Sequence, residues 1–285
     1  MPKDKNNEYR MRIEYEEWPI EKSRNLSDYI QPETETTILT PRLNFNTTKI
    51  FISIIMTSNP ENLNQRKKIR MSIDMMKNYN GNNVVVNFFI GLSENSTINK
   101  ELKQESDYYN DIIQESFDDS FYNSTITDGM ILKWVTKNCQ NTKYIMITHD
   151  DIYINIENLI QSIFDQEKHI VGGSLLMGRL KDWEQPVKKP FNQWYIPDYE
   201  YNDKYYPFYL DSSLGYVMST NIAKKLYEIS LTETFIHFGD VFFTGICAKK
   251  AGLIHTHNAD FTRNCLTEFK GCSSIITCLN GCKKN

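Results

Sequence analysis

Three side chains that can bind metal ions or protons, His149, Asp150 and Asp151, directly follow the apolar run KYIMIT. Two adjacent carboxylates repel each other unless a cation or hydrogen-bond donors neutralise them. Oxygen ligands together with one imidazole suit Mn²⁺ or Mg²⁺, bound along with a phosphate-bearing substrate. Asp150 or Asp151 would equally suit the cap of a turn, so the spacing alone leaves both interpretations open.

The elements that would position these residues alternate between apolar runs of strand length and helical patterns. We expect strands at 49–58, 83–92, 143–154 and 169–176, and helices at 65–79, 98–112, 127–139 and 156–164. In the first helix, Ile69, Ile73 and Met76 would share one face. This alternation predicts an α/β fold with a doubly wound, mostly parallel sheet, whose ligands bind beyond the carboxyl ends of the strands.

Glycine-rich and nucleophile motifs give little support to other enzyme classes. Gly172 and Gly173 follow an expected strand, where they would either let a substrate approach the backbone or form a plain turn. The sequence has no GxGxxG, GxxxxGK[ST], GxSxG or HExxH. These omissions argue against Rossmann dehydrogenases, P-loop enzymes, serine hydrolases and zincins.

Composition narrows the class of protein further. The chain has 285 residues, of which 40% are hydrophobic and 24% charged, with a formal net charge of −4. A globular protein is therefore expected, and nucleic acid is not an expected partner. No run approaches the length needed to span a bilayer. We expect an N-terminal stem or wrap at 1–48, one domain at 49–263 and a Cys-rich tail at 264–285.

The cysteines and glycosylation sequons indicate an oxidising compartment. Four of the six cysteines lie in the last 21 residues, where disulfides, reduced thiols and a zinc site are the alternatives, in that order. Sequons occur at Asn25, Asn46, Asn95 and Asn123. Together these features favour a secretory lumen, with any membrane anchor upstream of this segment.

Six groups of residues occur in the order typical of one known family. The family's R-x-x-I-R-x-T-W helix is matched by Arg66, Ile69, Arg70 and Ser72, with Ile73 in place of the tryptophan. Its Phe-Leu-Leu-Gly strand end is matched by Phe88, Phe89, Ile90 and Gly91. Its next signatures, which end in N-L-T and W-x-x-x-x-C, are matched by Glu105, Tyr109, Asp111, Ile112, Phe117, Asp119, Tyr122, Asn123, Thr125, Trp134 and Cys139.

The remaining matches include the chemically active positions. His149, Asp150 and Asp151 stand at the family's D-D-D metal motif. Tyr206, Pro207, Tyr209, Gly215, Tyr216, Val217 and Ser219 match its tyrosine block, and Gly239, Asp240, Val241 and Gly245 match its E-D-V-x-x-x-G. Through these matches, residues 50–262 resemble the beta-1,3-galactosyltransferase-like family, glycosyltransferase family 31.

The resemblance implies a single domain of GT-A type that binds a UDP-sugar through Mn²⁺ or Mg²⁺. It implies that Asp151 and His149 bind the metal, and that Asp150 lies beside the cofactor. Asp240 matches the family's base, which removes the proton of the acceptor hydroxyl. Arg66 and Arg70 either face the nucleotide or form a solvated helix face. The implied acceptor is a glycan on protein or lipid, and the implied location is the Golgi lumen or membrane.

Four departures from the family pattern each remove a charge. His149 replaces an aspartate, Ile147 and Thr127 stand where lysines are typical, and Gly239 replaces a glutamate. The family's C-terminal histidine ligand has no clear match, although His255 and His257 lie near the expected position. Imidazole still binds Mn²⁺, so the replacement by His149 need not abolish the metal site.

The sequence therefore supports two functions. The first is an inverting hexosyltransferase that moves galactose or an N-acetylhexosamine from a UDP-sugar to a glycan in a β1,3 linkage. The alternative is a non-catalytic GT-A protein that binds glycan or nucleotide, or acts as a partner subunit. A metal-dependent phosphohydrolase is a weaker third option, because two-metal sites need further ligands.

Overall fold

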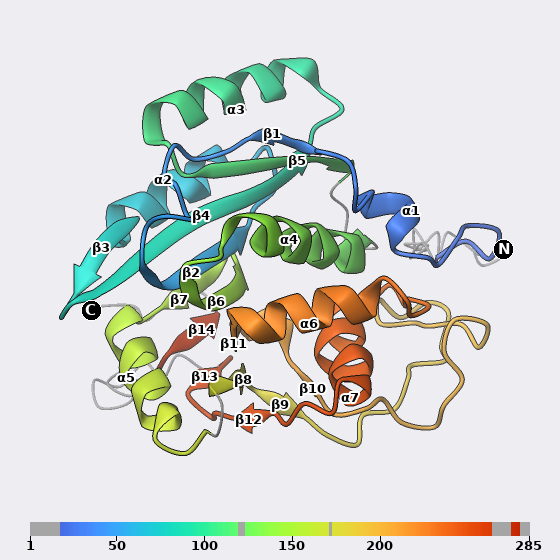
Figure 1. The fold of residues 1–285 in the computed structure, drawn as a ribbon. Helices are drawn as coiled ribbons and strands as arrows, with labels where there is room; N and C mark the ends of the chain where they lie inside the picture. Colours follow the sequence, from blue (N-terminus) through green and yellow to red (C-terminus); the bar gives the residue numbers. More distant parts are fainter. Residues whose placement is uncertain (1–17, 119–122, 171–172, 264–274, 280–285) are drawn as a thin grey trace, which may run out of the picture.

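The computed structural model describes residues 18–118, 123–170, 173–263 and 275–279 (Figure 1). Its strands are β1 (Thr37–Leu39), β2 (Ile50–Thr57), β3 (Met76–Tyr79), β4 (Asn82–Leu92), β5 (Ile112–Asp118), β6 (Thr142–His149), β7 (Ile152–Ile154), β8 (Leu176–Gly178), β9 (Leu180–Lys181), β10 (Tyr209–Leu210), β11 (Tyr216–Ser219), β12 (Thr256–His257), β13 (Phe261–Thr262) and β14 (Thr277–Leu279). Its helices are α1 (Ser27–Ile30), α2 (Leu63–Ser72), α3 (Ser96–Tyr109), α4 (Ser124–Asn138), α5 (Ile156–Glu167), α6 (Thr220–Ser230), α7 (Ala248–Lys250), the 3₁₀ helix η3 (Ser212–Leu214) and the π-helix η4 (Val241–Cys247).

A nine-stranded sheet organises the domain, in the order β1-β5-β4-β2-β6-β11-β8-β12, with β3 paired to β4. The four strands β5, β4, β2 and β6 run parallel, whereas β11 is antiparallel to both β6 and β8. Thr57 of β2 lies opposite His149 of β6, so these strands end at the same edge of the sheet. The expected α/β class with a mostly parallel central sheet is confirmed.

The predicted helix at 65–79 is wrong beyond Ser72. The chain becomes extended at Ile73, and Met76 starts strand β3, where its side chain is exposed. Strand β3 returns into β4 through Asn80 and Gly81, which have φ values of 51° and 88°. Positive φ at both central residues is the mark of a type I′ hairpin turn, which Asn-Gly favours.

The predicted strand at 169–176 is also wrong in most of its length. Of the described residues in that range, only Leu176 lies in a strand, the start of β8. Gly173 has φ of 67°, and a Cβ atom added there would meet no other atom within 4 Å, which is the geometry of an open turn. Gly172 lies outside the described residues.

Two hydrophobic clusters cover the two faces of the sheet. Strand β2 contributes to both: Ile52, Ile54 and Met56 belong to one cluster, and Ile55, between them, to the other. Helix α4 packs against α6 (Figure 1). Every residue of α4 from Thr125 to Val135 is buried, Trp134 among them, as expected for a helix covered on all sides.

The segment that precedes β2 packs against the domain. Trp18, Leu26, Ile30 and Phe45 are all part of the cluster that contains α4. Strand β1 adds to the edge of the sheet, antiparallel to β5. The described part of the expected stem or wrap therefore contributes to the core.

Cys139 and Cys247 are both buried free thiols, so they are not paired with each other. Cys278 is disulfide-bonded. Cys265, Cys272 and Cys282 lie outside the described residues. In the described parts of the chain, no helix is both long and apolar enough to span a membrane.

Candidate functional site

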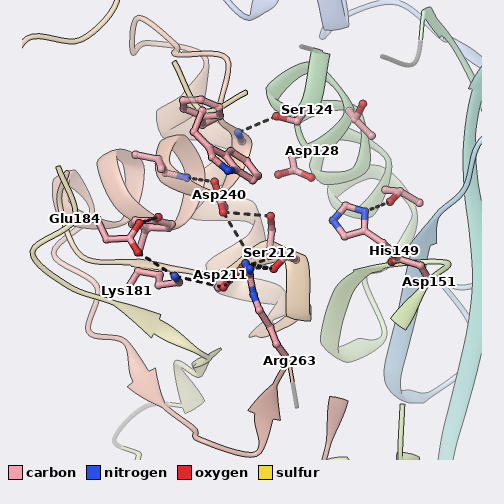
Figure 2. Close-up of a pocket in the computed structure, with 18 of the residues that line it drawn as sticks. Ser124, Asp128, His149, Asp151, Lys181, Glu184, Asp211, Ser212, Asp240 and Arg263 are labelled. Carbon is pink, nitrogen blue, oxygen red and sulfur yellow. Dashed lines mark hydrogen bonds and ion pairs between the residues drawn. The ribbon is translucent and has the colours of Figure 1, made fainter. Parts of the chain in front are cut away.

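A pocket of about 840 Å³ opens at the carboxyl ends of β2 and β6. One wall contains Thr57, Ser58 and the residues His149 to Asp151, and the opposite wall contains residues of η3 and η4. Figure 2 shows Asp128 and Ser124 of α4 facing this space from a third side. The volume suits a small ligand of several rings, since ligand pockets are typically about 300–1,000 Å³.

His149 and Asp151 both line the pocket. The Nδ1 atom of His149 lies 2.6 Å from Thr57 Oγ1, which fixes the ring and leaves Nε2 as its other polar atom. Burial lowers the pKa of His149, although Asp151 and Asp150 act in the opposite direction. A neutral imidazole is the form that binds metal ions.

Asp150 is tied to the end of β2 and the start of α2. Its Oδ2 atom accepts hydrogen bonds from Ser58 Oγ at 2.6 Å and Asn62 Nδ2 at 3.1 Å. Its backbone carbonyl accepts a third hydrogen bond, from Gln65 Nε2 at 2.7 Å. The carboxylate therefore has protein donors where a free carboxylate would need a cation.

Among the described residues, no group of three or more histidine, cysteine, aspartate or glutamate side chains could hold a metal ion. All three residues of the expected metal motif line the pocket. The Asp150 carboxylate already accepts hydrogen bonds from Ser58 and Asn62, so His149 and Asp151 are the two that remain available to a metal ion. The donor set therefore fits a cation that takes further oxygen ligands from a bound phosphate group.

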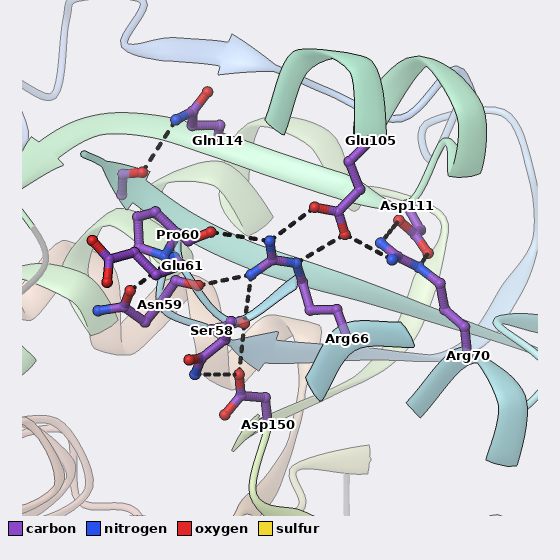
Figure 3. Close-up of polar contacts among 12 residues, drawn as sticks. Ser58, Asn59, Pro60, Glu61, Arg66, Arg70, Glu105, Asp111, Gln114 and Asp150 are labelled. Carbon is purple, nitrogen blue, oxygen red and sulfur yellow. Dashed lines mark hydrogen bonds and ion pairs between the residues drawn. The ribbon is translucent and has the colours of Figure 1, made fainter. Parts of the chain in front are cut away.

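Arg66 and Arg70 lie in a buried ion-pair network behind the pocket (Figure 3). Arg66 forms two hydrogen bonds to Glu105, at 2.9 and 2.8 Å, and Arg70 bonds to Glu105 and Asp111. Arg66 also donates to Ser58 Oγ at 3.1 Å. Neither arginine lines the pocket and both side chains are buried, so the expected nucleotide contact and the expected solvated face are both corrected. Arg66 holds the loop that presents Ser58, and Arg70 braces Glu105 and Asp111.

Asp240 lies in the pocket at the start of η4. Its Oδ1 accepts a hydrogen bond from Val241 N at 2.8 Å, and Oδ2 accepts weaker ones from Ser212 N and Oγ at 3.4 and 3.3 Å. Burial is the largest cause that raises the pKa of Asp240, to about 6, and the charge of Asp211 adds to it. A carboxylate with this pKa is ionised at neutral pH and binds a proton more readily than an ordinary aspartate.

The remaining wall contains charged side chains that the sequence did not single out. Lys181 lies 2.9 Å from Glu184 and 3.7 Å from Asp211, which also bonds to Arg263 at 3.2 Å. Lys181 ends strand β9 and Arg263 follows β13, and in sequence each resembles an ordinary solvated cation. Only the structure shows that both contact Asp211.

Two tyrosines of the family's tyrosine block line the pocket, whereas the two histidines near the expected third metal ligand do not. Of the tyrosine-rich segment 195–209, Tyr206 and Tyr209 line the pocket. His255 donates to Thr244 O at 2.5 Å, and His257 Nδ1 accepts from Leu180 N at 3.2 Å. Neither histidine lines the pocket.

Asp128 is a further pocket residue that the sequence did not single out. It lies on α4, with 8% of its surface exposed. Burial, and then the charge of Asp240, raise the pKa of Asp128 to about 8. The available signal was a carboxylate within the otherwise apolar helical run TDGMILKWV.

Comparison with known proteins places this pocket in context. A model of the galactosyltransferase family, described as "Galactosyltransferase", matches residues 64–259. Beta-1,3-galactosyltransferase 1 of Homo sapiens is 29% identical over 215 residues, which cover 74% of this chain and 64% of that protein. Beta-1,3-galactosyltransferase 5 of Pan paniscus is 30% identical over 204 residues, which cover 71% of this chain and 66% of that protein.

This chain thus covers less than two thirds of the length of either relative. Among solved structures, mouse xyloside xylosyltransferase 1 in its apo form aligns with a TM-score of 0.40 and 12% identity, over 82% of this chain and 98% of that one. The family match extends from α2 to β12 and includes the His149–Asp151 strand end and Asp240. Because the family model covers more than half of the sequence, this chain belongs to the galactosyltransferase family.

Proposed function

We propose that this protein is an inverting hexosyltransferase. It would move galactose or an N-acetylhexosamine from a UDP-sugar to a hydroxyl of a glycan acceptor, in a β1,3 linkage. The observation that carries the proposal is the position of Asp240, a buried carboxylate in the same pocket as His149 and Asp151. The names of the similar proteins, beta-1,3-galactosyltransferases 1 and 5, support the donor and the linkage.

The residues of the strand end are assigned to the donor. His149 Nε2 and Asp151 would hold Mn²⁺ or Mg²⁺ together with the diphosphate, and the cation would stabilise the negative charge of the departing UDP. Asp150 would position this strand end through its bonds to Ser58 and Asn62. Lys181 and Arg263 add positive charge on the facing wall.

Asp240 is assigned the role of general base. It accepts the proton of the acceptor hydroxyl while the new bond forms between that oxygen and the anomeric carbon. The bond from that carbon to the phosphate oxygen breaks at the same time, and UDP leaves with its electron pair. Attack on the face opposite to the leaving group inverts the configuration. The Val241 and Ser212 donors keep the carboxylate oriented for this transfer.

The acceptor would be a glycan on a protein or lipid, and the location the Golgi lumen or membrane. The four sequons and the Cys-rich C-terminal segment support a secretory location. The proposed organisation is an N-terminal wrap at 1–48, a catalytic domain at 49–263 and a tail at 264–285.

Transfer assays test the proposal directly. The purified chain is incubated with Mn²⁺, one of UDP-galactose, UDP-N-acetylglucosamine or UDP-N-acetylgalactosamine, and a panel of neutral oligosaccharides, and products are identified by mass spectrometry and linkage analysis. Asp240→Asn should reduce turnover by at least about a hundredfold, because the amide cannot accept the proton. Asp107→Asn, on the exposed face of α3, is the matched control and should keep full activity.

A GT-A protein that binds glycan or nucleotide without turnover is the alternative function. The four charge-removing departures from the family pattern, at Thr127, Ile147, His149 and Gly239, favour it. Metal-independent binding of UDP, with no transfer from any of the donors, would support this alternative and contradict the transferase.

A further inference from the structure

Asp128 differs from the other carboxyl groups of the pocket because it is buried and yet no described residue is hydrogen-bonded to its side chain, whereas Asp151, which also has no such partner, is exposed. Asp240 has Val241 and Ser212 as donors, and Asp211 has Ser213 and Arg263. Asp128 lines the same pocket and is more than nine-tenths buried. Its carboxyl oxygens are not among the fully buried atoms of the described chain, so they are open toward the pocket and can take a hydrogen bond from a bound molecule.

Gly239 shows how closely the Asp128 side chain is fitted into this position. A Cβ atom at residue 239 would lie 2.5 Å from Asp128 Oδ2 and 3.0 Å from Ser124 O. The φ angle of Gly239 is not positive, so the backbone conformation does not require glycine there. The Asp128 carboxyl group and the Ser124 backbone together occupy the space that a side chain would need, so this carboxyl group packs directly on the backbone that precedes Asp240.

The surroundings of Asp128 decide its protonation state. Asp240 faces it from the start of η4, and the buried Tyr216 faces it from β11. Lys133 of the same helix bonds instead to Ile30 O and Thr36 Oγ1. Because no cation is paired with Asp128 in the described chain and Asp240 is negative, Asp128 holds its proton at neutral pH.

An aromatic surface lies on the same side of the pocket. Phe238 immediately precedes Gly239, and its ring centroid lies 6.1 Å from that of Trp194. Both residues line the pocket. Aromatic faces suit the apolar faces of pyranose rings, so a sugar packed on them would bring its hydroxyl groups toward Asp240 and Asp128.

We propose that Asp128 determines acceptor specificity by hydrogen bonding a neutral polar group, a hydroxyl or an amide carbonyl, at the ring position next to the hydroxyl that Asp240 deprotonates. This inference rests on the proposed function only for assigning this side of the pocket to the acceptor. A protonated carboxyl group both donates and accepts a hydrogen bond, so it can bind an uncharged vicinal group at either oxygen. An ionised carboxylate there would instead select a cationic sugar.

Sugar binding tests the inference without requiring turnover. Methyl β-galactoside and methyl β-N-acetylglucosaminide are titrated by calorimetry into the chain with UDP and Mg²⁺ at pH 7 and pH 9. The variants are Asp128→Ala and Asp128→Asn, whose amide also donates and accepts hydrogen bonds but does not ionise. UDP affinity is measured in each variant, and unchanged values show that the donor side is folded.

Wild type should bind at least one of these sugars at pH 7 and lose affinity at pH 9, where Asp128 ionises. Asp128→Asn should bind it similarly at both pH values, and Asp128→Ala should bind about tenfold more weakly. Equal binding by wild type and Asp128→Ala, or binding of neither sugar by wild type, would overturn the inference. Tighter binding of methyl β-glucosaminide as its ammonium form, lost in Asp128→Asn, would also overturn it. Sugar binding as expected without any transfer would contradict the proposed function alone.

Discussion

Asp240 and Asp128 are close neighbours in one pocket, and their hydrogen bonds set them apart. Asp240 is held by donors from Val241 and Ser212, which favour its charged form, and its pKa is about 6. Asp128 has no such donors in the described structure, and its pKa is about 8. Near pH 7 the first is mostly ionised and the second mostly protonated, which gives one proton acceptor and one proton donor side by side.

The raised pKa of Asp128 predicts a pH dependence of stability. Its folded pKa of about 8 exceeds the ordinary value of 3.8, so the folded state binds this proton more tightly than the unfolded state. The resulting stabilisation is complete below about pH 4 and is lost as pH rises through about 8. Wild type should therefore lose melting temperature between pH 5 and pH 8.5 more steeply than Asp128→Asn.

Scanning calorimetry at several pH values in this range measures the difference. Asp240 contributes with the same sign in both proteins, since its pKa is raised as well, so it cancels in the comparison. Asp107→Asn serves again as the surface control and should follow the wild-type curve. Parallel curves for wild type and Asp128→Asn would show that Asp128 keeps an ordinary pKa when folded.

The metal dependence of UDP binding is also expected to rest on a single residue, Asp151. Asp151 is exposed in the pocket, so Asp151→Ala should leave the free energy of unfolding nearly unchanged. Its loss removes a carboxylate from the proposed cation, and Mn²⁺-dependent UDP affinity should fall by at least about tenfold. Calorimetric titration of UDP with Mn²⁺ and then with EDTA measures both states. Asp182→Ala, an exposed neighbour of the pocket wall, should bind UDP as wild type does.

At the scale of elements, the strand end could be predicted from sequence more readily than the parts that complete the pocket. A run such as KYIMIT followed by His149 to Asp151 is local, and parallel pairing brings β2 and β6 to one edge. The short strand β11 enters between β6 and β8 from far along the chain, which no local pattern indicates. The Asn80-Gly81 pair is typical of a hairpin turn, but the apolar spacing of Ile69, Ile73 and Met76 favours a helix up to that point, and the predicted helix rests on that spacing.

The role of Arg66 illustrates the same limit. Its position on a polar helix predicts solvent or ligand contact, whereas its side chain is 1% exposed and paired with Glu105. The partner comes from α3, 39 residues further along the chain, and the pairing arises from tertiary packing. Asp128 was missed for a related reason, since its neighbour Gly239 lies across the fold.

Breaking the buried ion-pair network of Arg66, Arg70 and Glu105 should destabilise the fold. Glu105→Ala leaves Arg66 and part of Arg70 without their buried partner, which we expect to lower the free energy of unfolding by about 3–5 kcal/mol. UDP affinity should fall too, because Arg66 supports Ser58 and Ser58 supports Asp150. Urea denaturation and UDP titration at low temperature measure the two effects.

The exposed pair Lys103–Asp107 on the same helix α3 provides the comparison. Lys103→Ala should change the free energy of unfolding by no more than about 1 kcal/mol. A similarly small cost for Glu105→Ala would mean that the arginines find other partners, and that the network does not fix the donor wall.

At the scale of the whole molecule, the N-terminal segment and the helix that holds Asp128 share one core. Phe45 packs edge-on against Trp134 of α4, with ring centroids 5.2 Å apart. Trp18 packs in the same way against Phe235, at 4.9 Å, close to the segment that leads to Asp240. The segment that composition presents as a polar stem therefore supports the pocket from behind.

Phe45→Ala should accordingly lower the free energy of unfolding by about 3–5 kcal/mol, the usual cost of removing a buried aromatic ring. Ile20→Ala, in the same segment but 70% exposed, should cost less than about 0.5 kcal/mol. Chemical denaturation of both variants distinguishes a packed segment from a loose one. Equal, small losses would show that residues before β2 add nothing to the core.

The close packing of Asp128 on Gly239 also has a consequence for how these two positions change during evolution. Any side chain introduced at 239 meets the carboxyl oxygen 2.5 Å away, so it is tolerated only after position 128 has become smaller or has moved. The backbone of Ser124, 3.0 Å from the same Cβ position, limits the size of any new side chain further. Changes at 128 and 239 are therefore coupled, and a library that varies the two positions together samples combinations that a change at 239 alone does not reach.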